Sequence, residues 1–267
     1  MTAEASWVGA MPDHYDRCLG PALFAPYAGH LAALAAGSAP RRVLELAAGT
    51  GLATAALVAA LPAAEITATD LNPAMVAWGA ERVTGATWRQ ADAQELDRPD
   101  ASVELVVCQF GVMFFPDRVG AYAEMARVLA PGGRVLLAVW AEVTASAFPA
   151  ALVASLAEVL PEDPPTFVAR VPHGYADPDR IVADLQAGGL VADRVDRVVL
   201  RGRAASARSL AEGFCLGTPL RFALQERGPL DVLTTAVGDA MTARLGEGPV
   251  EGDLAAYVVS ARRPDSD

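Results

Sequence analysis

The sequence predicts an α/β fold built on a mostly parallel sheet. Three observations support this: short apolar runs alternate with helical patterns, a glycine-rich turn ends the first run, and an acidic residue ends the second. The runs lie near residues 42–47, 65–70 and 86–90, and the helical patterns near 52–61 and 73–82. Such alternation is typical of strand–helix–strand units with parallel strands. Because the runs are largely apolar, we expect a sheet buried on both faces.

The first strand and its turn, Val43 to Gly51, are the most informative stretch. Gly49 and Gly51 lack a Cβ atom and can take positive φ, so the backbone can turn sharply and lie against a ligand. A helix rich in Ala, Leu and Val follows over 52–61, and Pro62 ends it.

The second strand ends in a carboxylate, Asp70, about twenty residues after the turn. At the carboxyl end of a strand next to a glycine turn, a carboxylate can accept hydrogen bonds from both ribose hydroxyl groups. The turn and Asp70 together therefore predict a nucleoside cofactor.

The remaining elements follow in order. We expect strands near 103–109 and 134–140 on either side of a helix near 118–130, and the regular alternation stops after Trp140. The segment 15–36 is predicted to be helical, with breaks or starts at Pro21 and Pro26. The later expected elements are a helix over 147–160, a helix from Asp177-Pro178 to Gly188-Gly189, a strand near 191–201, one or two helices within 206–246 and a last strand near 254–262.

The type of cofactor depends on a missing glycine. A dinucleotide site favours G-x-G-x-x-G, but Thr54 stands where the third glycine would be. The upstream residues Glu45-Leu46-Ala47-Ala48-Gly49-Thr50-Gly51 instead resemble the E/D-x-G-x-G-x-G motif of class I S-adenosylmethionine-dependent methyltransferases. Ala47 replaces the first glycine of that motif, and we expect it to narrow the pocket slightly.

The resemblance covers roughly residues 40–140. Its further parts are similar to the family's motifs in order and spacing: Asp70-Leu71-Asn72-Pro73-Ala74-Met75, Arg89-Gln90-Ala91-Asp92-Ala93, the run from Val103 to Phe110, and the helix and "LxPGG" turn over 121–133. The resemblance implies a Rossmann-like, doubly wound, seven-stranded sheet in the order 3-2-1-4-5-7-6, with the last strand antiparallel.

The same resemblance implies S-adenosyl-L-methionine as cofactor, S-adenosyl-L-homocysteine as product, and a set of binding residues. In it, Asp70 holds the ribose and Asp92 faces the adenine amino group. The cofactor-binding candidates are Tyr15, Glu45, Ala47, Ala48, Gly49, Gly51, Asp70, Leu71, Met75, Ala91, Asp92, Ala93, Gln109 and Phe110.

For domain organisation we expect one methyltransferase domain over 1–267, with an amino-terminal helical cover at 13–36 and a lid inserted between strands five and six at 141–176. The substrate-binding candidates are Met113, Phe114, Phe148 and Tyr175. The cluster after the fourth strand, which includes Met113 and Phe114, is also typical of plain core. A protonated acceptor such as a phenol needs a general base. Of the three histidines, His14 and His173 are the candidates, with ordinary surface histidines as the alternative.

Composition restricts the partners. The net charge is −11 and every basic residue is Arg, so nucleic acid and anionic membranes are disfavoured and a small-molecule acceptor is favoured. We expect no secretory leader, because the first residues have no basic segment followed by an apolar one, and the three scattered cysteines have no metal-ligand spacing. We therefore expect a cytoplasmic protein without a metal site, either a monomer or a homodimer.

Together these observations predict a methyltransferase that modifies an O, N or C nucleophile of a small molecule. Two alternatives remain open. One is an NAD(P)-dependent oxidoreductase, which the absent third glycine disfavours. The other is a protein of the same fold that uses the bound cofactor without methyl transfer, in a cyclase or a regulatory role.

Overall fold

Seven strands form one sheet in the order β3-β2-β1-β4-β5-β7-β6 in a computed structural model that describes residues 11–264. The strands are β1 Arg42–Glu45, β2 Glu65–Asp70, β3 Ala86–Gln90, β4 Val103–Gln109, β5 Leu129–Trp140, β6 Val191–Ala204 and β7 Val250–Arg262. The pairs β1–β2, β1–β4, β2–β3 and β4–β5 are parallel, whereas β5–β7 is antiparallel. The predicted α/β class and strand order are confirmed.

The carboxyl ends of the parallel strands are joined by backbone hydrogen bonds just beyond the sheet. Leu46 N donates to Val107 O over 2.8 Å, and Ala48 N donates to Thr69 O over 2.9 Å. Because parallel strands end at the same edge, the glycine turn lies next to the end of β2. This edge is where an open α/β sheet binds its ligands.

The chain divides into two compact units. The first comprises residues 1–26, 141–174 and 199–255, and the second comprises 27–140, 175–198 and 256–267. The expected lid at 141–176 begins where a segment of the first unit begins. The start of the chain, on which the expectation of no secretory leader rests, lies outside the described residues.

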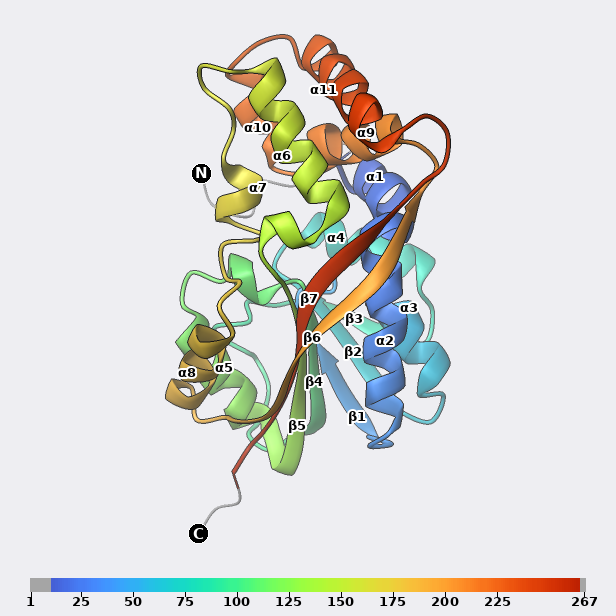
Figure 1. Ribbon diagram of the computed structural model, residues 1–267. Helices are drawn as coiled ribbons and strands as arrows, with labels where there is room; N and C mark the ends of the chain where they lie inside the picture. Colours follow the sequence, from blue (N-terminus) through green and yellow to red (C-terminus); the bar gives the residue numbers. More distant parts are fainter. Residues whose placement is uncertain (1–10, 265–267) are drawn as a thin grey trace. The chain divides into compact units, whose positions relative to one another are not determined.

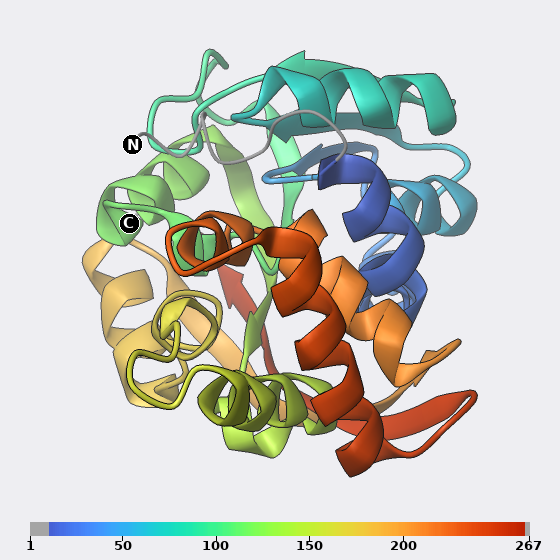
Figure 2. The same ribbon diagram turned by 90° about the horizontal axis from the view of Figure 1, so that it is seen from above.

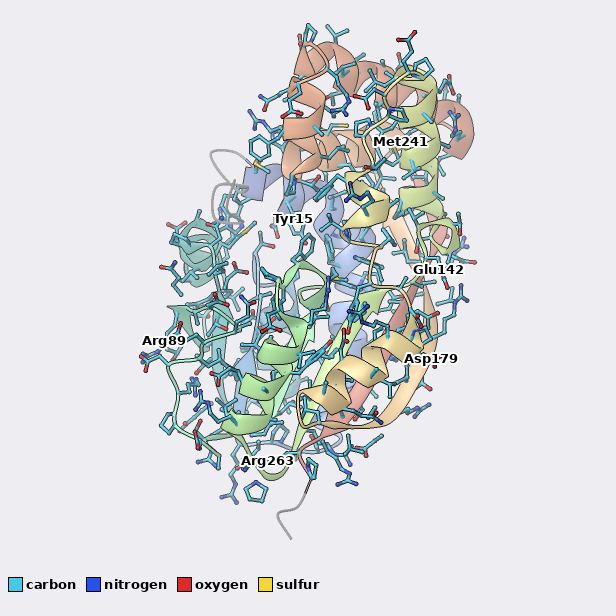
Figure 3. All side chains as sticks on the ribbon, turned by 90° about the vertical axis from the view of Figure 1, so that its left-hand side faces the viewer. Tyr15, Arg89, Glu142, Asp179, Met241 and Arg263 are labelled. Carbon is cyan, nitrogen blue, oxygen red and sulfur yellow. The ribbon has the colours of Figure 1, made fainter. Side chains whose placement is uncertain are left out.

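The second unit contains the sheet of parallel strands and its covering helices. In Figure 1, α5 and α8 lie together on one side of the strands and α2 and α3 on the other, and Figure 3 agrees. Figure 3 also labels Arg89 on the edge strand β3. The helices of this unit are α2 Ala25–Ala36, which starts just before it, α3 Leu52–Ala60, α4 Pro73–Arg82, η3 Val112–Phe114, α5 Arg118–Val128 and α8 Pro178–Ala187.

Two of these helices begin as the sequence predicts. Asp177 accepts from Asp179 N over 3.0 Å and Pro178 occupies the first turn of α8. Asn72 caps α4 in the same way, with Ala74 N donating to Oδ1 over 2.8 Å. Each cap satisfies backbone N–H groups that a helix start leaves without intrahelical partners.

The described part of the first unit is helical apart from parts of β6 and β7. Figure 2 shows α11 beside α9 and α6, which pack against one another through buried side chains such as Leu152, Leu210 and Met241. Figure 3 labels Met241 among these helices. The helices are α1 Met11–His14, η2 Tyr15–Phe24, η4 Val143–Ala145, α6 Ala147–Val159, α7 Phe167–Arg170, α9 Ala207–Gly217, α10 Leu220–Gln225 and α11 Leu230–Leu245.

The amino-terminal helix differs from expectation at Pro21, whereas Pro26 lies at the start of α2 as expected. Helical structure runs from Met11 to Ala36 without a break, and η2 is a π-helix that contains Pro21. The wider turn accommodates a residue without a backbone N–H. This stretch is long and apolar enough to cross a membrane by length and composition, but 61% of its most apolar window is buried in the protein, and a buried core helix meets the same criteria.

Other boundaries also differ. Strand β5 begins at Leu129, because Pro131-Gly132-Gly133 continues the strand through an irregular register opposite Val103 to Leu105. Strand β7 begins at Val250, four residues before the expected start. The segment 206–246 holds three helices instead of one or two. A proline stands directly before each of the last two: Pro219 before α10 and Pro229 before α11.

Candidate cofactor site

The glycine turn joins β1 to α3. Gly49 has φ +56° and Gly51 has φ +93°, values that L side chains rarely adopt. A Cβ atom on Gly51 would lie 2.9 Å from Val83 and 3.1 Å from Trp88, so packing also excludes a side chain there. A Cβ atom on Gly49 would meet no atom of the described chain within 4 Å. The backbone at Gly49 is therefore open to close approach by a ligand.

Ala47 also has a positive φ, +52°, where the resembled motif has glycine. A Cβ atom built on Gly111, just after β4, would lie 2.5 Å from the Cβ of Ala47 and 2.7 Å from Sγ of Cys108. The methyl group of Ala47 therefore fits because residue 111 has no side chain. The expected narrowing of the pocket by Ala47 stays a prediction.

The Asp70 carboxylate lies against the turn. Gly49 N donates to Oδ2 and Asn72 N donates to Oδ1, each over 2.9 Å. Burial raises the pKa of Asp70, and these two hydrogen bonds oppose that shift. Because a carboxylate offers about four acceptor positions, both oxygens keep capacity for further donors such as ribose hydroxyl groups.

Glu45 ends β1 and is only 1% exposed. Its Oε2 has no hydrogen-bond partner within residues 11–264. Burial raises the pKa of Glu45 to about 8; the Thr54 hydroxyl opposes the shift and the Asp70 charge adds to it. A buried carboxyl oxygen without a partner is costly, and a cationic ligand group at this edge would satisfy it.

Asp92 lies in a tight turn after β3. Its Oδ1 accepts from Gln94 N over 2.9 Å and from Gln94 Nε2 over 3.0 Å, and its carbonyl accepts from Glu95 N over 3.1 Å. Gln94 Oε1 in turn accepts from Asp117 N over 2.8 Å. Gln94 was not among the predicted site residues, because a glutamine in a polar turn gives no spacing signal.

Four further cofactor-binding candidates are apolar and follow Asp70 or flank Asp92 in the sequence. Ala91 N donates to Asp70 O over 3.1 Å, which joins the ends of β2 and β3. Met75 and Ala93 are buried, whereas Leu71 and Ala91 are half-buried. These positions are consistent with an apolar surface beside Asp70.

Gln109 is the last residue of β4, and Phe110 follows it with φ +55°. A positive φ is unusual for a residue with a bulky side chain, and backbone strain of this kind is often found at functional sites. The Phe110 ring stacks on Trp140 at 3.7 Å with an interplanar angle of 3°, and Tyr27 meets both rings edge-on. Tyr27 and Trp140 were not among the predicted site residues, because they lie far from Phe110 along the chain.

Three substrate candidates lie in the same unit as this edge. Met113 is buried, Phe114 is 41% exposed and Tyr175 is buried. The Tyr175 hydroxyl donates to Asp184 Oδ2 over 2.9 Å, and the Arg118 guanidinium lies 4.4 Å above its ring. Phe114 is the one of the three whose side chain solvent reaches readily.

His14 and Tyr15 lie in the first unit. His14 Nδ1 lies 3.0 Å from Glu212 Oε1, and Arg17 donates to the same oxygen over 2.5 Å. The Tyr15 ring, labelled in Figure 3, stacks on Phe24 with centroids 4.8 Å apart. The roles predicted for His14 and Tyr15 remain predictions.

His173 and Phe148 are also in the first unit. Phe148 is fully buried, and His173 is 7% exposed with Nδ1 donating to Ala141 O over 2.7 Å. Burial lowers the pKa of His173 below its ordinary value, and the hydrogen bond opposes the shift. Among residues 11–264, no group of three or more His, Cys, Asp or Glu side chains is arranged to hold a metal ion.

Comparison with known proteins agrees with this arrangement. Residues 43–133, which include the turn, Asp70, Asp92 and the end of β4, match the family described as "Methyltransferase domain". Over these residues the chain is similar to a methyltransferase domain. The Rossmann-like sheet described above is the fold of that domain.

The methyltransferase domain has both sequence relatives and structural neighbours. Demethylmenaquinone methyltransferase of Deinococcus radiodurans is 39% identical over 110 residues, 40% of this chain and 46% of the relative. The match thus spans about half the length of that relative. YcgJ of Bacillus subtilis aligns with a TM-score of 0.56 at 20% identity over 89% of this chain and 99% of the other. The [4+2]-cyclase SpnF aligns with a TM-score of 0.55 at 18% identity over 89% and 82%. At these identities the structural likeness concerns the fold alone.

The residues at the sheet edge fit the cofactor of this family. The unpartnered Oε2 of Glu45 suits an ammonium group, and the open backbone at Gly49 allows close approach. The remaining acceptor capacity of Asp70 suits ribose hydroxyl groups. All three features belong to one unit and lie on adjacent strand ends.

Proposed function

We propose that the protein transfers a methyl group from S-adenosylmethionine to an O, N or C nucleophile of a small molecule. The observation that carries the proposal is the set of Glu45, Gly49 and Asp70 at one strand edge: an orphaned buried carboxyl oxygen, an open turn, and a carboxylate ordered by the turn itself. A dinucleotide site would not need the orphaned carboxyl group.

Three acidic residues have distinct roles in the proposal. Asp70 accepts from the ribose hydroxyls, Asp92 accepts from the adenine amino group through Oδ2, and Glu45 balances the ammonium group. When bound, the cofactor supplies an activated methyl group on a sulfonium. The protein then needs mainly to orient the acceptor in line with that methyl group, since positioning alone reaches effective molarities of about 10⁵–10⁸ M.

A proton must leave when the acceptor is a phenol or an ammonium. His173 is the better of the two candidate bases, because its lowered pKa keeps the ring neutral at pH 7. With Nδ1 donating to Ala141 O, the neutral ring carries its basic lone pair on Nε2. A carbon acid that is already ionised needs no base, and His173 then has no part in the chemistry.

The proposal includes a small-molecule acceptor and a cytoplasmic location. The Deinococcus relative is named for demethylmenaquinone, which is neither a protein nor a nucleic acid. The net charge of −11 disfavours nucleic acid and anionic membranes. All three cysteines are free and buried, as is usual in a reducing compartment.

The acceptor side is assigned to 141–176 and to the amino-terminal segment at 13–36. The support is physical: methyl transfer is favoured where water is excluded, and segments that must open for substrate belong to the less stable parts of a fold. Hydrogen exchange with cofactor and acceptor bound tests the assignment. Unchanged protection in both segments would place the acceptor elsewhere.

Titration calorimetry with S-adenosylhomocysteine, NAD and NADP tests the cofactor. We expect micromolar binding of the first and none of the others, and tight nicotinamide binding alone would overturn the proposal. Incubation with methyl-labelled S-adenosylmethionine and a panel of phenols, amines and carbon acids then tests transfer. Cofactor binding with no labelled product across the panel would favour non-catalytic use of the cofactor.

A further inference from the structure

Gln94 connects two segments that the sequence places far apart. Its backbone N–H and its side-chain Nε2 both donate to Asp92 Oδ1, over 2.9 and 3.0 Å, and its Oε1 accepts from Asp117 N over 2.8 Å. Asp117 is the N-cap residue of α5, and its side chain accepts from Gly120 N. One side-chain amide therefore fixes the adenine-side acid relative to the start of α5.

The orientation of this amide is determined by its partners. A backbone N–H can meet only an acceptor, so the side-chain oxygen of Gln94 must face Asp117 N. The NH₂ group is then turned toward Asp92, which as a carboxylate only accepts. The arrangement is self-consistent, and a reversed amide would place donor against donor and acceptor against acceptor.

The two hydrogen bonds from Gln94 occupy one oxygen of Asp92 and leave the other available. Oδ1 receives both donors, and Oδ2 receives no hydrogen bond from the described residues. The two hydrogen bonds to Oδ1 thereby fix the orientation of the carboxylate, with Oδ2 available as an acceptor. A group with two N–H donors and no lone pair, such as a conjugated exocyclic amine, is the natural partner for that oxygen.

Helix α5 also fixes the loop that follows the turn at Asp92. Glu124 Oε2 accepts from Leu96 N over 2.7 Å, while Arg127 donates to Leu96 O over 2.8 Å and to Arg98 O over 2.7 Å. Glu124 and Arg127 are themselves paired at 2.7 Å. The turn at Asp92 is thus anchored at Asp117 and again at Leu96, so its geometry exists before any ligand binds.

We infer that Gln94 is a positioning residue that makes this protein selective for a 6-amino purine, by orienting Asp92 Oδ2 toward that amino group. The inference rests on the proposed function, since it concerns the same cofactor site. Preorganisation of this kind increases affinity because the cost of ordering the acceptor is met during folding. Gln94 itself does not touch the ligand.

The test compares S-adenosylhomocysteine with its analogue that has hydrogen in place of the 6-amino group. For the native protein we expect about a 10- to 100-fold preference for the amino compound, the range for a hydrogen bond to a charged group. Gln94→Met keeps the side-chain length and removes the two hydrogen bonds that the side-chain amide makes, to Asp92 Oδ1 and from Asp117 N. We expect it to reduce the preference to about threefold or less, mainly by weakening the amino compound.

Two further variants separate positioning from stability. Asp92→Asn keeps the turn acceptor Oδ1 and presents a donor in place of Oδ2, so it should abolish the preference while the melting temperature stays near the native value. Gln186→Met, on the exposed side of α8, is the matched control and should retain both the preference and the melting temperature. A general loss of stability in Gln94→Met would weaken both ligands equally and leave their ratio unchanged.

The outcomes are distinguishable. If the native protein shows the preference and Gln94→Met retains it in full, the positioning role is overturned while the proposed cofactor stands. If the native protein binds both compounds equally, Asp92 does not face the amino group and the inference fails. If the native protein binds neither compound, the proposed function and the inference fail together.

Discussion

The methyl group of Ala47 occupies the space that a side chain at Gly111 would need: the two Cβ positions would lie 2.5 Å apart. We predict that Gly111→Ala destabilises the protein by about 1–3 kcal/mol, the usual cost of overpacking. Gly111 has φ −105°, so the backbone itself tolerates alanine and the cost is steric. Chemical denaturation measures the change.

The double variant Ala47→Gly/Gly111→Ala provides the control. Removing the methyl group of Ala47 should recover part of the loss, although Sγ of Cys108 would still lie 2.7 Å from the new side chain. A coupling free energy above about 0.5 kcal/mol between the two positions is expected for residues in contact. Additive effects would show that the two positions do not share this space.

Asp70 orders the turn and is proposed to hold the ribose, so its substitution should affect both stability and binding. Asp70→Asn replaces one acceptor oxygen by a donor that faces a backbone N–H of either Gly49 or Asn72. We expect about 10- to 100-fold weaker binding of S-adenosylhomocysteine together with a lower melting temperature. Asp179→Asn, on the exposed start of α8 and labelled in Figure 3, is the matched control. Native affinity in a folded Asp70→Asn protein would place the ribose elsewhere.

The raised pKa of Glu45 leads us to predict that the free energy of unfolding falls as pH rises. The pKa of Glu45 is about 8 in the folded state, above the ordinary 4.5. Between pH 4.5 and about pH 8 the folded state therefore keeps a proton that the unfolded state has released. The contribution to stability is therefore complete below about pH 4.5 and is lost as pH approaches 8. Glu45→Gln should remove this slope, whereas Glu65→Gln, at the exposed start of β2, should retain it.

Ligand binding offers a second measurement of the same group. If an ammonium group settles against Glu45, binding at pH 7 should release a proton from the native protein and none from Glu45→Gln. Calorimetry in buffers of different ionisation enthalpy measures that proton. Identical proton release in both proteins would assign it to another residue.

Rates should distinguish the two histidine candidates. With a phenol acceptor, we expect His173→Gln to lower kcat by about 10²- to 10⁴-fold with little change in cofactor affinity, the range for a lost general base. His14→Gln should have a smaller effect, because the His14 imidazole is already hydrogen-bonded to Glu212, which also pairs with Arg17. A reversed order of effects would exchange their assignments. With a pre-ionised carbon acid, His173→Gln should be near native.

The sequence was sufficient for the features that depend on local pattern. The turn at Gly49 and Gly51, the acid at Asp70 and the capped start at Asp177 each follow from residue types at fixed spacing. The strand order came through resemblance to a family and is confirmed. These features are local or are shared by the fold, which is why one sequence reveals them.

Features that depend on long-range contact were not predictable. Nothing near Gln94 indicates that Asp117 will lie within 2.8 Å of it, and nothing near Ala47 indicates that position 111 must lack a side chain. The continuous helix through Pro21 was missed because a proline ordinarily breaks an α-helix, whereas a π-helical turn accommodates it. Each of these needs the folded chain, since the partner is chosen by tertiary packing.

The stacked pair of Phe110 and Trp140 has an optical consequence. An indole held parallel to a phenyl ring at 3.7 Å, with Tyr27 edge-on to both, is a rigid and asymmetric chromophore. Its near-ultraviolet circular dichroism should be strong, and it arises at the strained residue that follows β4. The protein thus contains an intrinsic spectroscopic reporter at the end of a central strand, and ligand binding there can be followed without attaching a label.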